Sequence, residues 1–384
     1  MSTTLQTQHW VAGFRGALVN PGEEIRLAEP RAFGDETLRQ VLHLAGGGSH
    51  VRVRLTNRYS KDELVIGAAR IAGRKNGSEI LAETDTVLRF DGAERVRVAA
   101  GADLVSDPVE LAVAAGSDVL VSVYLPEATG FPAFAQIPVE SGWIASGDRT
   151  GDAALSDAEE TTSRFLLTGV DVLVDSETPV LVAFGDSWFE GVGSTLGGNA
   201  RSVDVLNERL AEAGIRGWAV NQGIGGTRLL TDQIGEHGLA RFERDVLSVP
   251  GVKAVWANFG INDLILTGAA TPEQLIAGYK ELARLAHEAG LPIYANTIGP
   301  FAGTIYPGLS LAEGNPIRLV VNDWLRGSDI FDAVFDVAAA VEDPQARDFI
   351  RPEFDSGDGL HLNDAGHRVM AGTVDLTVLA RALG

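Results

Sequence analysis

The sequence predicts two structural classes in one chain: an all-β domain over residues 1–175 and an α/β domain with a parallel sheet over residues 178–384. In the first half, short segments alternate apolar and polar residues, a period of two that is typical of half-buried strands. In the second half, short apolar segments alternate with amphipathic segments of helical period, which favours parallel strands joined by helical crossovers. A chain of 384 residues is long enough for two domains, each with its own core.

The predicted strands of the first half are separated by turns that contain glycine or aspartate. Residues 50–57 show the pattern most clearly, because three apolar residues alternate with Arg52 and Arg54. Further strands are expected at 64–72, 86–90, 96–99, 109–113, 119–125 and 165–174. Strands of this length and spacing favour a jelly-roll-like or similar sandwich. The segment 127–162, rich in glycine, alanine, serine and aspartate, is expected to be a long irregular connection.

The elements of the second half have clearer boundaries. Strands are expected at 180–184, 218–222, 253–259, 292–298 and 333–337, and helices at 199–213, 272–289, 316–326 and 364–382. Thr271 is the expected N-cap of the second helix, with Pro272 at its first position and Gly290 just after its end. Pro316 is expected to open the third helix in the same way.

Composition narrows the class of protein. The 31 Lys and Arg residues face 52 Asp and Glu residues, and a net charge of −21 disfavours nucleic acid and membrane surfaces as partners. The absence of cysteine excludes disulfides, thiolate nucleophiles and Cys-ligated metals. No metal-ligand spacing is apparent, so neither a metal nor another cofactor is expected. The first residues lack a secretory signal and no apolar run could span a bilayer, so a cytoplasmic location is expected.

Four short polar segments of the second half contain residues suited to acyl transfer. They are Gly185-Asp186-Ser187, Asn221-Gln222-Gly223-Ile224-Gly225-Gly226-Thr227, Gly260-Ile261-Asn262-Asp263 and Asp358-Gly359-Leu360-His361. The first three follow predicted strands, and a parallel sheet gathers its carboxyl strand ends along one edge. A serine nucleophile needs an imidazole base and an acidic partner, while the oxyanion needs backbone N–H or amide donors. Each segment alone could equally be a turn, and Asp358 could be a helix N-cap.

Taken together and in this order, the four segments resemble the SGNH (GDSL-type) hydrolase superfamily of serine esterases over roughly residues 178–384. The resemblance implies a flavodoxin-like, three-layer α/β/α domain. It also implies that Ser187 is the nucleophile, His361 the general base and Asp358 the carboxylate that orients it. The oxyanion would be bound by the backbone N–H groups of Ser187 and Gly226 and by the side-chain amide of Asn262. No G-x-S-x-G motif occurs, which disfavours an α/β-hydrolase.

Two features depart from the usual pattern of that superfamily. Trp188 follows the expected nucleophile where an aliphatic residue is more common, so its indole is expected to narrow or line the acyl site. The β-rich region resembles, in layout only, members that act on carbohydrate esters. In it, Trp10, Trp143, Phe131 and Phe134 are either glycan-stacking surfaces or core residues. His367 is expected to point outward from the last helix.

The sequence therefore predicts a serine esterase that removes a small acyl group, preferably acetyl, from a carbohydrate or another small oxygen ester. One alternative is a broad carboxylesterase or lysophospholipase that accepts longer acyl chains. A second is a non-catalytic carbohydrate-binding protein. The sequence gives no indication of the oligomeric state.

Overall fold

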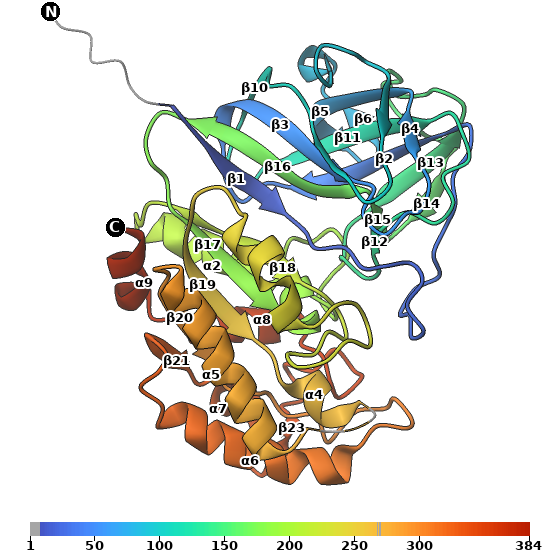
Figure 1. Ribbon diagram of the computed structural model, residues 1–384. Coiled ribbons are helices and arrows are strands. Elements are labelled where there is room, and N and C mark those ends of the chain that lie inside the picture. Colours follow the sequence, from blue (N-terminus) through green and yellow to red (C-terminus); the bar gives the residue numbers. More distant parts are fainter. Residues whose placement is uncertain (1–7, 267, 269) are drawn as a thin grey trace, which may run out of the picture. The chain divides into compact units, whose positions relative to one another are not determined.

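The computed structural model describes residues 8–266, 268 and 270–384 (Figure 1). The chain divides between Thr178 and Pro179 into two compact units, here called the first and the second unit.

The first unit consists of antiparallel strands, as predicted, and its two larger sheets are consistent with a β-sandwich. One sheet has the order β1 (His9–Arg15), β16 (Leu167–Val174), β3 (Gly48–Thr56) and β10 (Val109–Val113), with β9 (Asp103–Val105) also on β3. The other has the order β14 (Glu159–Thr161), β13 (Gly142–Ser146), β2 (Glu36–His43), β11 (Asp118–Leu125), β5 (Ala68–Asn76) and β6 (Glu79–Ile80), with β7 (Thr86–Val87) on β5. Two smaller pairs join β12 (Phe134–Ala135) to β15 (Arg164–Phe165) and β4 (Leu64–Ile66) to β8 (Val96–Val98).

The expected irregular connection at 127–162 is wrong in part, because it contains β12, β13 and β14. Strand β13 pairs with β2 along its whole length and buries Trp143 and Ile144. Only these few apolar residues mark the strand, and the surrounding Gly, Ser and Asp residues conceal it. Of the four candidate stacking aromatics, Trp143 and Phe134 are buried in the core, whereas Phe131 is exposed.

The second unit is a three-layer α/β/α domain around a wholly parallel sheet, as predicted. The order is β18 (Trp218–Gly223), β17 (Val180–Gly185), β19 (Val252–Asn258), β20 (Ile293–Asn296) and β21 (Ala333–Phe335). Numbered within this sheet, the order is 2-1-3-4-5, that of flavodoxin-like folds. Ligands in such folds bind where the order reverses, which is here beside the carboxyl ends of β17 and β19.

Helices cover both faces of this sheet. The longer ones are α2 (Ser202–Glu212), α5 (Pro272–Glu288), α6 (Leu311–Arg326), α8 (Asp364–Gly372) and α9 (Leu376–Leu383), and the shorter ones are α1 (Ser187–Glu190), α3 (Gly238–Phe242), α4 (Ile261–Ile265) and α7 (Val337–Val341). Helix α5 packs against α6, and α2 packs against α8. Figure 1 shows the α5–α6 pair on the near side of the sheet and α8 behind it. A two-stranded hairpin, β22 (Glu342–Asp343) and β23 (Ala346–Ile350), follows α7.

Two predicted helix boundaries are wrong. The helix expected at 364–382 is two helices, because Asp375 caps α9 by accepting a hydrogen bond from the backbone N–H of Thr377. Helix α6 begins at Leu311, so Pro316 lies inside it rather than at its start. Pro316 deprives only the carbonyl of Ala312 of its helical partner. Ala312 is exposed, so water can hydrogen-bond to that carbonyl.

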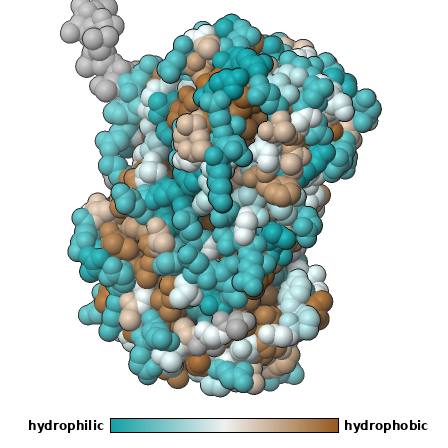
Figure 2. Space-filling model, turned by 45° about the vertical axis from the view of Figure 1, so that its right-hand side comes forward, coloured by the Kyte–Doolittle hydropathy of each residue, from teal (hydrophilic) through white to brown (hydrophobic). Residues whose placement is uncertain are grey.

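In the described part of the chain, no helix combines the length and the apolar character that a membrane crossing requires. Figure 2 shows hydrophilic residues over much of one face, with hydrophobic residues in several separate areas.

His367 does not point outward, contrary to the prediction. It is completely buried, and its Nδ1 lies 2.8 Å from the hydroxyl of Ser202 on α2. It shares the inner face of α8 with Met370 and Ala371, which are also buried. The helical period of the sequence alone does not determine whether His367 lies on the buried or the exposed face of α8. The packing of α2 against α8 places it on the buried face. Burial disfavours the charged imidazolium and lowers the pKa of His367 from 6.5 to about 4.

This burial predicts acid sensitivity. As the pH falls below 6.5, the unfolded chain binds a proton at residue 367 before the folded chain does, so the free energy of unfolding decreases until about pH 4. Between pH 6.5 and about pH 4, this residue is expected to lower the free energy of unfolding by about 3 kcal/mol. Urea unfolding of wild type and His367→Gln at several pH values measures it, and the variant should lose less stability on acidification. Equal losses in both proteins would contradict the assignment.

Candidate active site

Three neighbouring strands of the parallel sheet end at the same level, and this brings the polar segments that follow them together. In the sheet register, Gly185 at the end of β17 is paired with Gly223 of β18 and with Asn258 of β19. The segments that follow, which begin at Asp186, Ile224 and Phe259, therefore leave the sheet at the same edge. This edge lies at the position where the strand order reverses.

Ser187, His361 and Asp358 form one hydrogen-bonded series. Ser187 is the first residue of α1, and its Oγ lies 3.0 Å from Nε2 of His361. The Nδ1 of His361 lies 2.6 Å from Oδ2 of Asp358. Ser187 and His361 are each 7% exposed, so both residues are largely buried.

The carboxylate of Asp358 is held by four donors. Its Oδ1 accepts hydrogen bonds from the backbone N–H groups of Leu360 and His361, at 2.9 and 2.8 Å. Its Oδ2 accepts from the hydroxyl of Tyr306, at 3.0 Å, in addition to the imidazole. Burial alone would raise the pKa of Asp358, but the hydrogen bonds and charge of His361 outweigh it and hold this pKa well below its usual range. An ionised Asp358 favours the tautomer with the proton on Nδ1, which leaves Nε2 free to accept the proton of Ser187.

Hydrogen bonds hold the segments that carry two of the predicted oxyanion donors, Gly226 and Asn262. The backbone N–H of Gly225, next to Gly226, donates to Oε2 of Glu190 at the end of α1, at 2.5 Å. The amide Nδ2 of Asn262 donates one hydrogen to the carbonyl oxygen of Thr227, on the other side of Gly226, at 2.9 Å. Gly226 therefore lies between two anchored residues. Within the described residues, the backbone N–H groups of Ser187 and Gly226 donate to no other protein group.

Two buried carboxyl groups fix the segments that carry these donors. Asp186 accepts hydrogen bonds from the backbone N–H of Trp188 and from the amide of Asn258, at 3.1 and 2.9 Å. Asp263 accepts from the backbone N–H groups of residues 229 and 230, at 2.8 and 3.1 Å. Burial raises the pKa of Asp186 to about 7 and that of Asp263 to about 6. Their contacts are with the backbone and an amide, so they position the site's segments.

Sequence reasoning missed Glu190 and Tyr306. Glu190 lies one helical turn after Ser187, a spacing that could have indicated a shared environment. Tyr306 lies in the segment 299–310, which has no regular period, so only the folded chain shows that it reaches Asp358.

Trp188 has a different position from the one expected. The indole is 1% exposed and does not line a solvent-accessible acyl site. Its Nε1 donates a hydrogen bond to the carbonyl oxygen of Leu360, at 2.9 Å. On its other side the ring packs so closely on Gly299 that a Cβ there would lie 2.1 Å from it. Trp188 thus links helix α1, which begins at Ser187, to the loop that carries Asp358 and His361.

A pocket of about 470 Å³ opens beside Asp263, the neighbour of Asn262. Small apolar residues line part of it, but so do the charged side chains of Arg228, Asp263 and Glu281. Ser187, Asn262 and His361 are not among its lining residues. Among the described residues, no group of three or more His, Asp or Glu side chains is arranged to hold a metal ion.

Residues 183–369 match the model of the GDSL-like Lipase/Acylhydrolase family. Similar solved structures include Est24, a carbohydrate acetylesterase from Sinorhizobium meliloti, with a TM-score of 0.43 and 16% sequence identity. The match covers 53% of this chain and 99% of that chain. Another is a putative arylesterase from Agrobacterium tumefaciens, with 20% identity, 54% and 100% coverage, and a TM-score of 0.41. A third is the aryl esterase of M. smegmatis, with 17% identity, 54% and 100% coverage, and a TM-score of 0.43. A comparison with curated proteins gave no match.

The contact of Trp188 with Leu360 predicts a kinetic effect. Trp188→Phe keeps an aromatic ring in the buried space but removes the donor that holds the 358–361 loop. We expect kcat for an acetyl ester to fall about tenfold, the equivalent of one hydrogen bond of about 1.4 kcal/mol, with KM little changed. Steady-state kinetics beside Trp324→Phe, a control on α6, measures the effect. A raised KM with unchanged kcat would instead indicate that the indole contacts the acyl group.

Proposed function

This chain contains a GDSL-like lipase/acylhydrolase domain and is a serine ester hydrolase, and we propose that Ser187, His361 and Asp358 are its catalytic residues. We further propose that it removes a small acyl group, preferably acetyl, from an oxygen ester of a carbohydrate or another small alcohol. The activity is assigned to residues 178–384, and residues 1–175 are assigned an accessory role.

The observation that carries the proposal is the series Ser187 Oγ, His361 Nε2, His361 Nδ1 and Asp358 Oδ2, with separations of 3.0 and 2.6 Å. In the first step, Oγ bonds to the ester carbonyl carbon while its proton passes to Nε2. The tetrahedral intermediate then loses the alcohol, which takes the proton from His361. Water gives a proton to His361 and attacks the acyl-enzyme, which releases the acid and restores Ser187.

Three donors of this chain are suited to the oxyanion. The backbone N–H groups of Ser187 and Gly226 have no other protein acceptor among the described residues. Asn262 uses one amide hydrogen on Thr227, and this contact orients the second for the substrate. The nucleophile, the base and the oxyanion donors all come from the chain, so the proposed reaction requires no cofactor.

One observation supports a small acyl group. Ser187 and His361 are each only 7% exposed, which favours a small acyl group over a bulky one at the point of attack.

Substitution of the nucleophile tests the catalytic assignment. Ser187→Ala should lower kcat for an acetyl ester by at least about 10⁴-fold, because the remaining groups cannot form the acyl-enzyme. Asn262→Ala should lower kcat by about 10²- to 10³-fold, the usual effect of losing one oxyanion donor. Acetate release is the measurement, and Ser248→Ala is a control at an exposed serine. Undiminished hydrolysis by Ser187→Ala would contradict the assignment and favour a non-catalytic role for this site.

The acyl preference is tested in the same assay with acetyl, butyryl and octanoyl esters of one alcohol. We expect kcat/KM to be highest for the acetyl ester. A rise with chain length would exclude the acetyl proposal in favour of a broad carboxylesterase or lysophospholipase.

A further inference from the structure

Three exposed apolar side chains gather beside the loop that carries Asp358 and His361. Ile305 is 70% exposed, and Tyr306 and Phe349 are each 45% exposed. Single exposed apolar residues are ordinary on a protein surface. Figure 2 shows such residues in separate areas of the face that it displays. Three on neighbouring segments beside one catalytic loop are a more specific arrangement.

Two of these residues contact Asp358 directly. The backbone N–H of Ile305 donates to the carbonyl oxygen of Asp358, at 3.0 Å, and the hydroxyl of Tyr306 donates to its Oδ2, also at 3.0 Å. The ring of Tyr306 meets that of His361 edge to face, with centroids 6.4 Å apart and an interplanar angle of 71°. The exposed ring of Tyr306 is therefore next to the imidazole, and the backbone of Ile305 is anchored beside it.

Phe349 reaches the same place from strand β23. A Cβ at Gly303 would lie 3.1 Å from Cδ1 of Phe349 and 3.5 Å from Cα of Gly359, so the phenyl ring and the loop that carries Asp358 and His361 both lie against Gly303. Gly359 has a φ of +69°, and a Cβ there would lie 2.0 Å from the carbonyl oxygen of Gly303. Only glycine permits this approach of the two segments.

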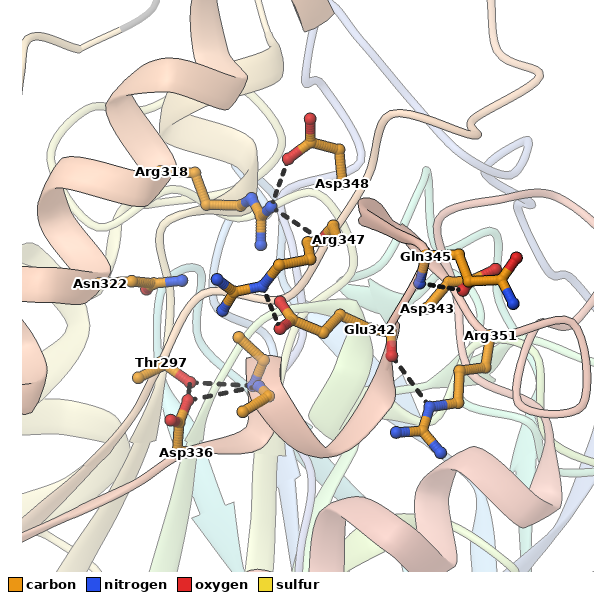
Figure 3. A network of polar contacts seen from close by, with 12 residues as sticks. Thr297, Arg318, Asn322, Asp336, Glu342, Asp343, Gln345, Arg347, Asp348 and Arg351 are labelled. Carbon is orange, nitrogen blue, oxygen red and sulfur yellow. Dashed lines mark hydrogen bonds and ion pairs between the residues drawn. The ribbon is translucent and has the colours of Figure 1, made fainter.

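Polar contacts hold this arrangement in place (Figure 3). Arg318 of α6, which is buried, donates to the carboxylate of Asp348, at 2.9 Å. The carbonyl oxygen of Asp348 in turn accepts from the backbone N–H of Ala302, at 2.9 Å. Arg347 donates to the carboxylate of Glu342, at 2.6 Å, which links β23 to β22. Both segments that carry the apolar residues are therefore fixed before a ligand arrives, which reduces the entropy lost on binding.

The direction of the reaction indicates what this surface would contact. The departing alcohol oxygen must receive its proton from Nε2 of His361, so the alcohol part of the ester lies on the histidine side of the site. We propose that Ile305, Tyr306 and Phe349 form a subsite for the alcohol part of the substrate, and that this subsite takes an apolar planar ring. This inference rests on the proposed function and narrows its substrate class.

The chemistry of the three side chains favours an aromatic alcohol over a sugar. Tyr306 supplies their only polar atom, and Asp358 already accepts its hydrogen bond. A pyranose could stack only its C–H face here, and the hydroxyl groups at its edge would find no new hydrogen-bond partner among these three side chains. A phenyl ring can instead pack edge to face or offset against Tyr306 and Phe349.

The test compares benzyl acetate with ethyl acetate, which share an acyl group and both release a primary alcohol. Ile305→Ser and Phe349→Ala should each lower the benzyl-to-ethyl ratio of kcat/KM about three- to tenfold, the equivalent of one aromatic or apolar contact. The ratio is the measure because a general disturbance of the loop that carries Asp358 and His361 would slow both esters together and leave the ratio unchanged. Val320→Ser, at an exposed apolar residue of α6, is the matched control and should leave the ratio unchanged.

A further variant separates the ring of Tyr306 from its hydroxyl. Tyr306→Phe keeps the ring but loses the contact with Asp358, so both esters should slow equally and the ratio should stay constant.

Three results would overturn the subsite. The first is a wild-type ratio in both Ile305→Ser and Phe349→Ala. The second is a larger loss, in these variants, for the primary acetate of a methyl glucoside than for benzyl acetate, which would assign the surface to sugars. The third is a failure of the hydrolase assignment itself: either the wild-type protein hydrolyses none of these esters, or the Ser187→Ala variant hydrolyses them as well as wild type. Of the three results, only this one would also contradict the proposed function.

Discussion

The site depends on the close approach of β17 and β19 where these parallel strands end. A Cβ at Gly185 would lie 2.4 Å from the carbonyl oxygen of Asn258, so the strands can end side by side only with glycine at residue 185. Asn258 then donates to Asp186, and Asp186 caps the helix that begins at Ser187. The sheet thus determines both where Ser187 lies and in which direction its helix leaves the strand.

The proposed base is positioned differently, because Asp358 and His361 lie on a loop outside the sheet. Side chains from separate segments hold that loop: Ser187 contacts His361, Trp188 contacts Leu360 and Tyr306 contacts Asp358. Each contact alone is a single hydrogen bond of modest net energy. Together they fix the direction of the imidazole, on which proton transfer depends. The proposed subsite uses the same segments, so substrate recognition and the position of the base are coupled through Tyr306.

The sequence predicted those parts that depend on local patterns. Unbroken apolar segments indicated the parallel sheet. The order of the four polar segments indicated that Ser187 and His361 belong to one site, although more than half of the second unit separates them in the sequence. Features that depend on tertiary packing were not predictable. The burial of His367 follows from the packing of α2 against α8, and the direction of Trp188 follows from a carbonyl oxygen contributed by a distant loop. Strand β13 is only five residues long, and the Gly, Ser and Asp residues around it hid its short apolar run.

The central claim is that an acyl group is transferred to Ser187 during turnover. It is tested most directly by quenching the reaction with an acetyl ester at early times and locating the acetyl group by peptide mass spectrometry. We expect a transient acetyl group on the peptide that contains Ser187, and none on that peptide from the Ser187→Ala variant. An acetyl intermediate on any other residue, or hydrolysis without an acyl-enzyme, would contradict this account.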